Sequence, residues 1–152
     1  SEPPLSHMIA GILEHIPELT VFLNPTVASY ERFGGPKAPE YISWSNQNRS
    51  QLIRVPAAVD EYRRAELRSP DPTTNPYLAF ALLIYAGLDG IQQKLPLPAP
   101  TDLNLFTASA DILAHLQRLP LTLREAATLA ANSSFVSKYL PKTIVQTYYD
   151  QR

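Results

Sequence analysis

Two strand-like runs, each ending at a proline, lie in QLIRVPAAVDEYRRAELRSP, residues 51–70. The first is Gln51 to Val55 and the second is Arg63 to Ser69. A third run, Tyr41 to Ser45, alternates in polarity and is rich in residues that favour strands. Because the connections between the runs are short, the sequence predicts an antiparallel sheet of short strands at about residues 41–69.

The last of these runs carries its charges on one face. Side chains alternate along a strand, so Arg64, Glu66 and Arg68 share one face. Ala65 and Leu67 lie on the other, apolar face. A carboxylate between two arginines suits an anionic or metal-bound ligand, but it is more often part of a cross-strand ion-pair ladder. The strand alone leaves both interpretations open.

The N-terminal segment has the pattern of an amphipathic helix. Its apolar stripe consists of Leu5, Met8, Ile9, Ile12, Leu13 and Ile16. The helix is expected to end at or before Pro17, because proline cannot continue the hydrogen-bond ladder. His7 and His15 lie off the stripe and are predicted to be surface histidines.

The C-terminal half, residues 73–152, is predicted to be mostly helical. Asn75 can cap a helix, and the residues that follow carry no charge up to Leu88, so this helix is expected to be buried on most sides. Gly87 and Gly90 would allow another segment to approach this helix closely, and they mark its expected end. Further helices are predicted at residues 110–116, at residues 122–131 behind a capping box, after Ser134 and after Pro141.

Composition excludes several classes of protein. The chain has 152 residues, no cysteine and a formal net charge of −1, which excludes a disulfide scaffold and a cysteine metal site and argues against a general nucleic-acid binder. The uncharged stretch from Thr73 to Leu88 is shorter than the roughly 20 apolar residues of a membrane span. The N-terminus lacks the pattern of a signal peptide. We therefore expect a soluble, cytoplasmic protein without a nucleic-acid or membrane partner.

The cationic residues are mostly arginines and are unevenly placed. Nine of the thirteen are arginine, and six of these lie between Arg32 and Arg68. The guanidinium fork pairs in bidentate fashion with carboxylates and phosphates, which lysine cannot do. The alternative is that these arginines form structural ion pairs at strand ends.

Several motifs resemble the C-terminal half of glutamine synthetase, of the bacterial type I. They are Asn24-Pro25-Thr26-Val27-x-Ser29-Tyr30-x-Arg32, Ala38-Pro39, Asn48-Arg49-Ser50, Ile53-Arg54-Val55-Pro56, Glu66-x-Arg68-Ser69-Pro70-Asp71-Pro72, Asn75-Pro76-Tyr77-Leu78-Ala79-Phe80-Ala81 and Ala86-Gly87-Leu88-Asp89-Gly90-Ile91. They stand in the family's order with nearly its spacing, from about Ile9 to Phe106. The specificity is strong because independent motifs agree.

The resemblance implies that the chain has an α+β fold, in which helices back the sheet. It also implies that the chain is a fragment of the glutamine synthetase/guanido kinase-like catalytic domain. Residues 1–72 would supply a helix, the flap loop and the active-site strands, and residues 73–152 the helical part. The family's N-terminal β-domain and the first half of the catalytic domain have no counterpart here. In whole enzymes a neighbouring subunit completes each active site in a double ring, a dodecamer.

The resemblance also implies a reaction. The family uses ATP and Mg²⁺ (or Mn²⁺) to join ammonium to glutamate through γ-glutamyl phosphate. By position, Glu66 falls on a ligand of the metal that bridges the ATP phosphates. Arg32 and Arg68 fall on arginines that hold the carboxylate of the substrate glutamate. Arg49 falls on a catalytic arginine that contacts the reacting phosphoryl group and glutamate, and Arg54 on one at the nucleotide phosphates. Because Arg49 and Arg54 are five residues apart, a single strand would point them in opposite directions, so Arg49 is expected in the turn before the strand.

Three places depart from the family pattern. The Gly- and Pro-rich loop at residues 34–39 matches the mobile flap but is one residue shorter, and Lys37 stands where the flap glutamate would be. That glutamate shields the intermediate and helps deprotonate ammonium, which a protonated lysine cannot do. Asp60-Glu61 replaces a lysine near the nucleotide. Phe106 replaces a tyrosine that some members adenylylate, which excludes that modification at this position.

Three hypotheses follow. The first is the C-terminal part of a glutamine synthetase, which alone makes no glutamine and exposes apolar surface. The second is a γ-glutamyl ligase that uses another amine, such as a polyamine, and Lys37 gives it weight. The third is a non-catalytic regulatory or binding module. Joint retention of the site arginines and Glu66 argues against the third hypothesis.

Overall fold

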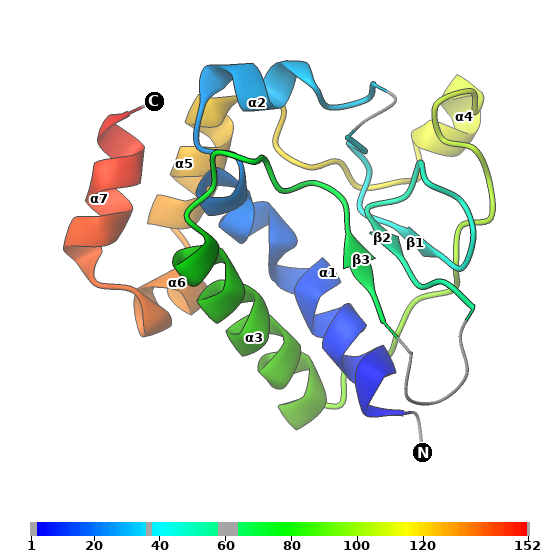
Figure 1. The fold of residues 1–152 in the computed structure, drawn as a ribbon, viewed down its shortest axis with the longest axis horizontal. Coiled ribbons are helices and arrows are strands. Elements are labelled where there is room, and N and C mark those ends of the chain that lie inside the picture. The colour runs from blue at the N-terminus through cyan, green and yellow to red at the C-terminus, as the bar shows by residue number, and fades with distance from the viewer. Residues whose placement is uncertain (1–2, 36–37, 58–63, 152) are drawn as a thin grey trace. The chain divides into compact units, whose positions relative to one another are not determined.

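The computed structural model describes residues 3–35, 38–57 and 64–151 and divides into two compact units (Figure 1). The helical unit consists of Ser1–Glu31, Pro70–Leu97 and Pro120–Arg152. The second unit consists of Arg32–Ser69 and Pro98–Leu119 and contains the strands. Each unit combines segments that are distant in the sequence, and the helices and the small sheet together make the predicted α+β fold.

The helical unit is built around two long helices, α1 and α3. Its elements are α1 (Pro4–Leu23), α2 (Val27–Glu31), α3 (Pro76–Gln92), α5 (Leu123–Ala131), α6 (Ser134–Tyr139) and α7 (Lys142–Asp150). Helix α1 packs against both α3 and α5, and α7 packs against α5. The predicted caps are confirmed, because Asn75 Oδ1 accepts from the Tyr77 and Leu78 amides and Thr122 Oγ1 accepts from the Glu125 amide.

Helix α1 continues through Pro17, so the predicted end at this proline is wrong. Proline lacks the N–H that would bond to the carbonyl of Leu13, which costs a helix interior about 3 kcal/mol. The last turn nevertheless stays helical because Leu19, Phe22 and Leu23 are fully buried. Burial of these side chains outweighs the local cost of the proline.

Helices α1 and α3 meet backbone to backbone at two glycines. A Cβ atom added to Gly90 would lie 2.7 Å from both the N and the Cα of Gly11, and closer still to the carbonyl oxygen of His7. Gly90 therefore provides the predicted close approach. Helix α3 does not stop there, because it runs on to Gln92.

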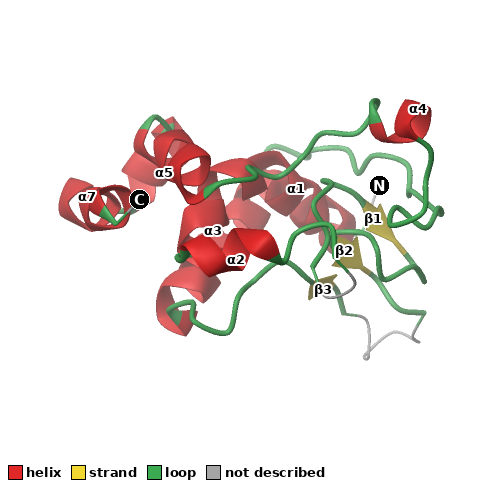
Figure 2. Cartoon of the chain, turned by 90° about the horizontal axis from the view of Figure 1, so that it is seen from above, coloured by secondary structure: helices red, strands yellow, loops and turns green. Residues whose placement is uncertain are grey.

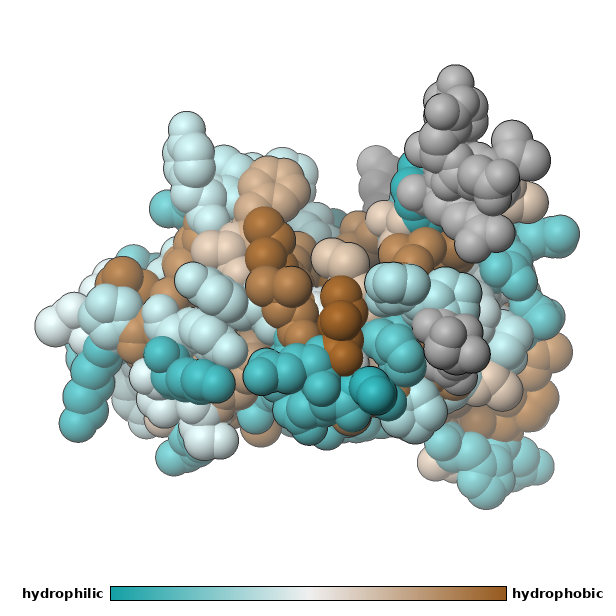
Figure 3. All heavy atoms as spheres, turned by 90° about the horizontal axis from the view of Figure 1, so that it is seen from below, coloured by the Kyte–Doolittle hydropathy of each residue, from teal (hydrophilic) through white to brown (hydrophobic). Residues whose placement is uncertain are grey.

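Helix α3 is not buried on most sides, contrary to the sequence prediction. Tyr77 is 86% exposed, Phe80 67% and Leu88 53%. These residues lie on one face of the helix, together with Ile84. Apolar side chains also reach the surface among hydrophilic ones in Figure 3. The chain therefore has the exposed apolar surface that the sequence predicted.

None of the helices in the described ranges is long and apolar enough to cross a membrane.

His15 is not a surface histidine, which corrects the sequence prediction. Its Nε2 lies 2.6 Å from Asp89 Oδ2 on α3, and its Nδ1 lies 3.3 Å from Glu18 Oε2. Its ring stacks on that of Phe135, with centroids 3.8 Å apart. His7 is half-buried as well, with Nδ1 2.8 Å from the carbonyl oxygen of Leu95. Packing of α3 and α6 against this side of α1 produces these contacts, and no pattern within α1 reveals them.

The Asp89 contacts predict an acid-sensitive contribution to stability. Burial raises the pKa of Asp89, but the hydrogen bonds from His15 and Gln93 outweigh it and hold the pKa below its ordinary value. A carboxylate whose pKa is lowered by folding stabilises the chain above its unfolded pKa of about 3.9, and this contribution is lost as pH falls through the folded pKa.

We expect Asp89→Asn to cost about 1–3 kcal/mol at pH 7, because charge-assisted hydrogen bonds are weakened. Urea unfolding at pH 7 and across pH 2–5 measures the effect. The variant should also lose less stability than the unchanged chain as acid is added. The control is Asp111→Asn, at an exposed aspartate of α4 (Ala110–Leu113). An acid profile of Asp89→Asn as steep as that of the unchanged chain would contradict the prediction.

The second unit contains a sheet of three very short strands, β1 (Trp44–Ser45), β2 (Ile53–Arg54) and β3 (Glu66–Leu67), drawn in yellow in Figure 2. β2 and β3 pair antiparallel as predicted, but β1 and β2 pair parallel, so an all-antiparallel sheet is wrong. A long parallel pair needs a crossover of a dozen or more residues. Here each strand has only two residues, and the chain folds back within residues 46–52, so that β2 begins beside β1 and runs in the same direction.

Candidate functional site

The centre of the candidate site is an ion pair between adjacent strands. Arg54 on β2 and Glu66 on β3 are directly opposed partners in the sheet. Arg54 Nε donates to Glu66 Oε2 at 2.9 Å, and Nη2 donates to Oε1 at 3.0 Å. The guanidinium fork therefore binds both oxygens of the carboxylate.

A second arginine approaches the same carboxylate. Arg64 Nε lies 3.5 Å from Glu66 Oε1, and its side chain is 60% exposed. The hydrogen bond from Arg54 is the main cause that lowers the pKa of Glu66, and Arg64 adds to it. Glu66 is thus held as a carboxylate in contact with two cations.

Arg68 directly follows β3, and one nitrogen of its guanidinium has no hydrogen-bond partner among the described residues. Its amide donates to the carbonyl oxygen of Leu52 at 2.9 Å, which places it in the sheet. Its Nη1 is buried and makes no hydrogen bond within the described chain. Burial lowers the pKa of Arg68, and the charges of Arg49 and Arg54 lower it further, while Glu66 offsets part of this. Such a group is suited to receive an anion.

Arg32 and Arg49 come from the loops beside the sheet. Arg32 Nη2 donates to the carbonyl oxygen of Ser69 at 3.2 Å, which ties the residue after α2 to the end of the β3 segment. Arg49 lies in the turn before β2, as the sequence predicted, and is exposed. The turn is stabilised by Asn48, whose Oδ1 accepts from the Ser50 amide at 2.9 Å. The unit thus brings together Arg32, Arg49, Arg54, Arg64, Glu66 and Arg68.

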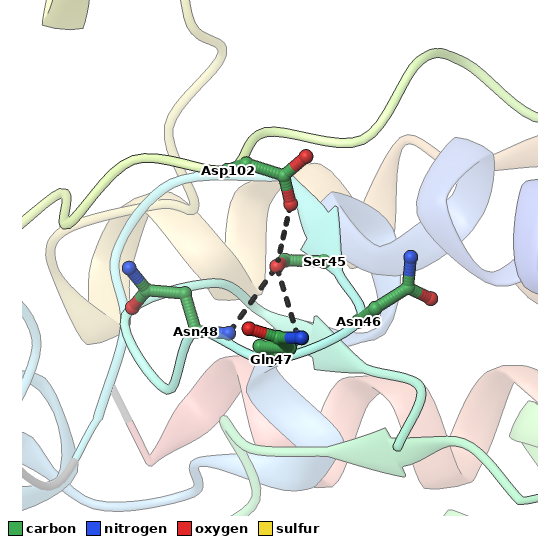
Figure 4. A pocket seen from close by; sticks show the side chains of 5 residues that line it. All are labelled: Ser45, Asn46, Gln47, Asn48 and Asp102. Atoms are coloured by element: carbon green, nitrogen blue, oxygen red, sulfur yellow. Dashed lines mark hydrogen bonds between the residues drawn. The ribbon is translucent and has the colours of Figure 1, made fainter. Parts of the chain in front are cut away.

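Asp102 makes a supporting contact that no motif of the sequence indicates. Asp102 Oδ1 accepts from Ser45 Oγ at 3.1 Å, and the same hydroxyl accepts from the Gln47 and Asn48 amides (Figure 4). These residues and Asn46 line an open cavity of about 380 Å³. Asp102 follows the alternating prolines of residues 95–100, and nothing in that local pattern indicates that it packs on the turn that carries Arg49.

The other predicted positions are Lys37, Asp60-Glu61 and Phe106. Lys37 and Asp60-Glu61 lie outside the described residues. Phe106 is 40% exposed.

The described residues do not by themselves fit the divalent metal that the resemblance implies. They contain no group of three or more histidine, aspartate or glutamate side chains that could hold a metal ion. Both oxygens of Glu66 are engaged by Arg54, and a hard cation needs several free oxygen ligands.

Comparison with known proteins decides the family. The model of the glutamine synthetase catalytic domain matches residues 3–152. This chain belongs to the glutamine synthetase family. The glutamine synthetase of Methanosarcina mazei is 46% identical over 145 residues, which cover 93% of this chain and 32% of that protein. That of Methanocaldococcus jannaschii is 44% identical over 153 residues, covering 99% of this chain and 34% of that protein.

A solved structure agrees with the family assignment. The chain titled "GmaS/ADP complex-Conformation 1" superimposes with a TM-score of 0.82 at 29% identity, over 98% of this chain and 35% of that chain. This chain therefore spans about a third of the length of each of these three relatives.

Proposed function

We propose that this chain supplies the substrate- and phosphate-binding arginines of a glutamine synthetase, in a protein that forms glutamine from glutamate, ammonium and ATP. One observation carries the proposal: Arg68 Nη1 is buried without a partner in the described chain, beside Arg49 and Arg54. A guanidinium nitrogen that is buried near other cations is costly unless it binds an anion. Both glutamate and ATP are anions.

Each arginine has a proposed role. Arg68 and Arg32 bind the carboxylate of the substrate glutamate, because a guanidinium fork matches a carboxylate. Arg49, exposed in its turn, contacts the transferring phosphoryl group and stabilises the charge that spreads over its oxygens. Arg54 binds the nucleotide phosphates. The ADP complex of the structural relative supports a nucleotide at a site of this fold.

The metal of the proposed reaction needs ligands beyond the described residues. Glu66 is the metal ligand implied by the resemblance, yet its carboxylate is held by Arg54 and Arg64. We therefore assign no step of the reaction to a metal held by this chain. The chain alone should form no glutamine from glutamate, ATP, Mg²⁺ and ammonium, and formation above the blank would contradict this.

A chimera tests the proposed function. Residues 3–152 replace the matching C-terminal third of the Methanosarcina mazei enzyme, which the identity of 46% over 145 residues makes feasible. We expect the chimera to form glutamine from ammonium in an ATP-dependent reaction. A well-folded chimera that binds neither ATP nor glutamate would contradict the proposal.

The same chimera tests the second candidate, a γ-glutamyl ligase for another amine, which the Lys37 position favours. Ammonium, methylamine and putrescine are compared as substrates at equal concentration. Faster turnover of an organic amine than of ammonium, reversed by Lys37→Glu, would establish the second candidate. We expect ammonium to be the preferred substrate.

A further inference from the structure

The outward face of α3 is apolar along nearly the whole helix. It consists of exposed side chains spaced three and four residues apart, which lie in one stripe that we call the α3 face: Tyr77, Phe80, Ile84, Leu88 and Ile91. Residues 73–88 carry no charge, and the charge that follows, Asp89, is held away from this face by its contact with His15 on α1. A helix that is apolar on every side is normally buried, so the α3 face has the character of a covered surface.

The α3 face is large enough for a specific contact. Ile84 is 51% exposed and Ile91 36%, and the other three side chains of the face are more exposed than these two. At about 200 Å² for a fully exposed large side chain, the exposed parts together amount to roughly 600 Å², the upper end for the largest apolar patch of a monomer. Two such faces in contact would bury roughly 1,200 Å², which reaches the range of specific, stable interfaces.

The α3 face is complementary to itself about a two-fold axis. In a two-fold interface, residue i of one copy contacts residue j of the other, and j contacts i. With the axis at Ile84, two antiparallel helices place Tyr77 opposite Ile91 of the second copy and Phe80 opposite Leu88 of the second copy, because each pair is equidistant from residue 84. Each aromatic ring then packs on an aliphatic side chain, so the helices can stay at one distance along the whole stripe.

A parallel pair of helices would pack less evenly. It would place Tyr77 and Phe80 against their own copies at one end, and Leu88 and Ile91 against theirs at the other. The aromatic end would hold the helices apart and leave a gap at the aliphatic end, and such a gap forfeits dispersion energy. The order of large and smaller side chains along α3 therefore favours the antiparallel arrangement.

We propose that two copies of this chain associate through the α3 face, with their α3 helices antiparallel about a two-fold axis at Ile84. The absence of charge on the face removes the like-charge repulsion that two identical surfaces would otherwise meet. The proposal goes beyond the proposed function, because the α3 face lies in the helical unit whereas the arginine cluster lies in the second unit. If the chimera forms no glutamine, this association of the chain is still expected.

Disulfide trapping in the full chain tests the position of the axis. The chain has no cysteine, so Ile84→Cys introduces a single thiol that the axis places opposite its own copy. Under mild oxidation, we expect Ile84→Cys to form a covalent dimer at least about ten-fold faster than Ile144→Cys, because a disulfide needs Cα atoms within about 7 Å. Ile144 is the matched control, since it is an exposed isoleucine on another helix, α7.

A pair of charge variants tests the antiparallel register. The unchanged chain should sediment at twice its mass of 16.9 kDa. Phe80→Lys and Leu88→Glu should each be monomeric alone, because each brings an unpaired charge into an apolar interface. Mixing the two variants should restore a dimer, because the introduced charges would lie opposite each other. Phe106→Lys adds the same charge at an exposed phenylalanine outside the α3 face and should leave the dimer intact.

The measurements distinguish a second copy from other occupants of the α3 face. A chain that stays monomeric at its highest soluble concentration, or Ile84→Cys that cross-links no faster than Ile144→Cys, would overturn the proposal and assign the face to a different polypeptide. A dimer that Ile84→Cys traps but that the mixed charge variants do not restore would be parallel, which also contradicts the proposal. Assemblies larger than a dimer that Phe80→Lys leaves unchanged would contradict it as well. Circular dichroism of each variant verifies that the helices have formed.

Discussion

Arg68→Ala in the chimera should lower kcat/KM for glutamate by about 100-fold. A bidentate, charge-assisted pair with a substrate carboxylate is worth about 3 kcal/mol, and each 1.36 kcal/mol corresponds to about ten-fold in rate. The structural reason is the buried Nη1 of Arg68, which has no partner in the described chain and can receive the substrate. Steady-state assay of glutamine formation measures the effect.

Two variants show whether the effect comes from substrate binding. Arg68→Lys keeps the charge without the fork, so its loss should be intermediate. Arg124→Ala removes an exposed arginine of α5 and should leave the rate unchanged. Arg68→Ala activity within about two-fold of the parent chimera would contradict the assigned role.

The same substitution should not destabilise the chain. Burial and the charges of Arg49 and Arg54 lower the pKa of Arg68, so folding disfavours its charged form. Loss of activity with equal or greater stability is characteristic of a residue placed for binding. If Arg68→Ala instead unfolds the chain, the arginine is a structural ion-pair residue, which was the alternative raised by the sequence.

Gly90→Ala should destabilise the chain by about 3 kcal/mol or more, because overpacking against rigid backbone forces helices apart. The added Cβ would meet backbone atoms of Gly11 and His7 on α1, which cannot rotate away. For a chain of this size, such a loss lowers the Tm by about 6–12 °C. Urea and thermal unfolding measure it.

Gly87→Ala is the matched control on the same helix. Its Cβ would meet the side chain of Met8, with Cγ 2.6 Å away, and that side chain is flexible. Alanine also favours a helix over glycine by about 1 kcal/mol, so the net change at Gly87 should be within about 1 kcal/mol of zero. Equal destabilisation by the two substitutions would contradict the close crossing at Gly90.

The sequence predicted the local features of this fold well. Asn75 and Thr122 cap α3 and α5 as their side chains indicated, because a cap depends only on residues within one turn. Arg49 lies in a turn as expected. The family resemblance was likewise carried by local motifs and is confirmed over residues 3–152.

Several predictions that required distant contacts failed. Helix α1 continues through Pro17 because burial of its last turn outweighs the proline, and burial depends on the partner elements. The parallel pairing of β1 with β2 follows from the shape of the turn between them. The exposed face of α3 depends on what covers it, which an uncharged sequence does not specify.

The candidate site shows the same division. The period of two along a strand placed Glu66 and Arg68 on one face, and the sequence by itself determined which residue types are present. Only the tertiary structure decided that Arg54 lies opposite Glu66 and that Arg68 keeps a buried donor without a partner in the described chain. The reason is physical: side-chain period is a property of one strand, whereas register and burial arise between segments far apart in the chain.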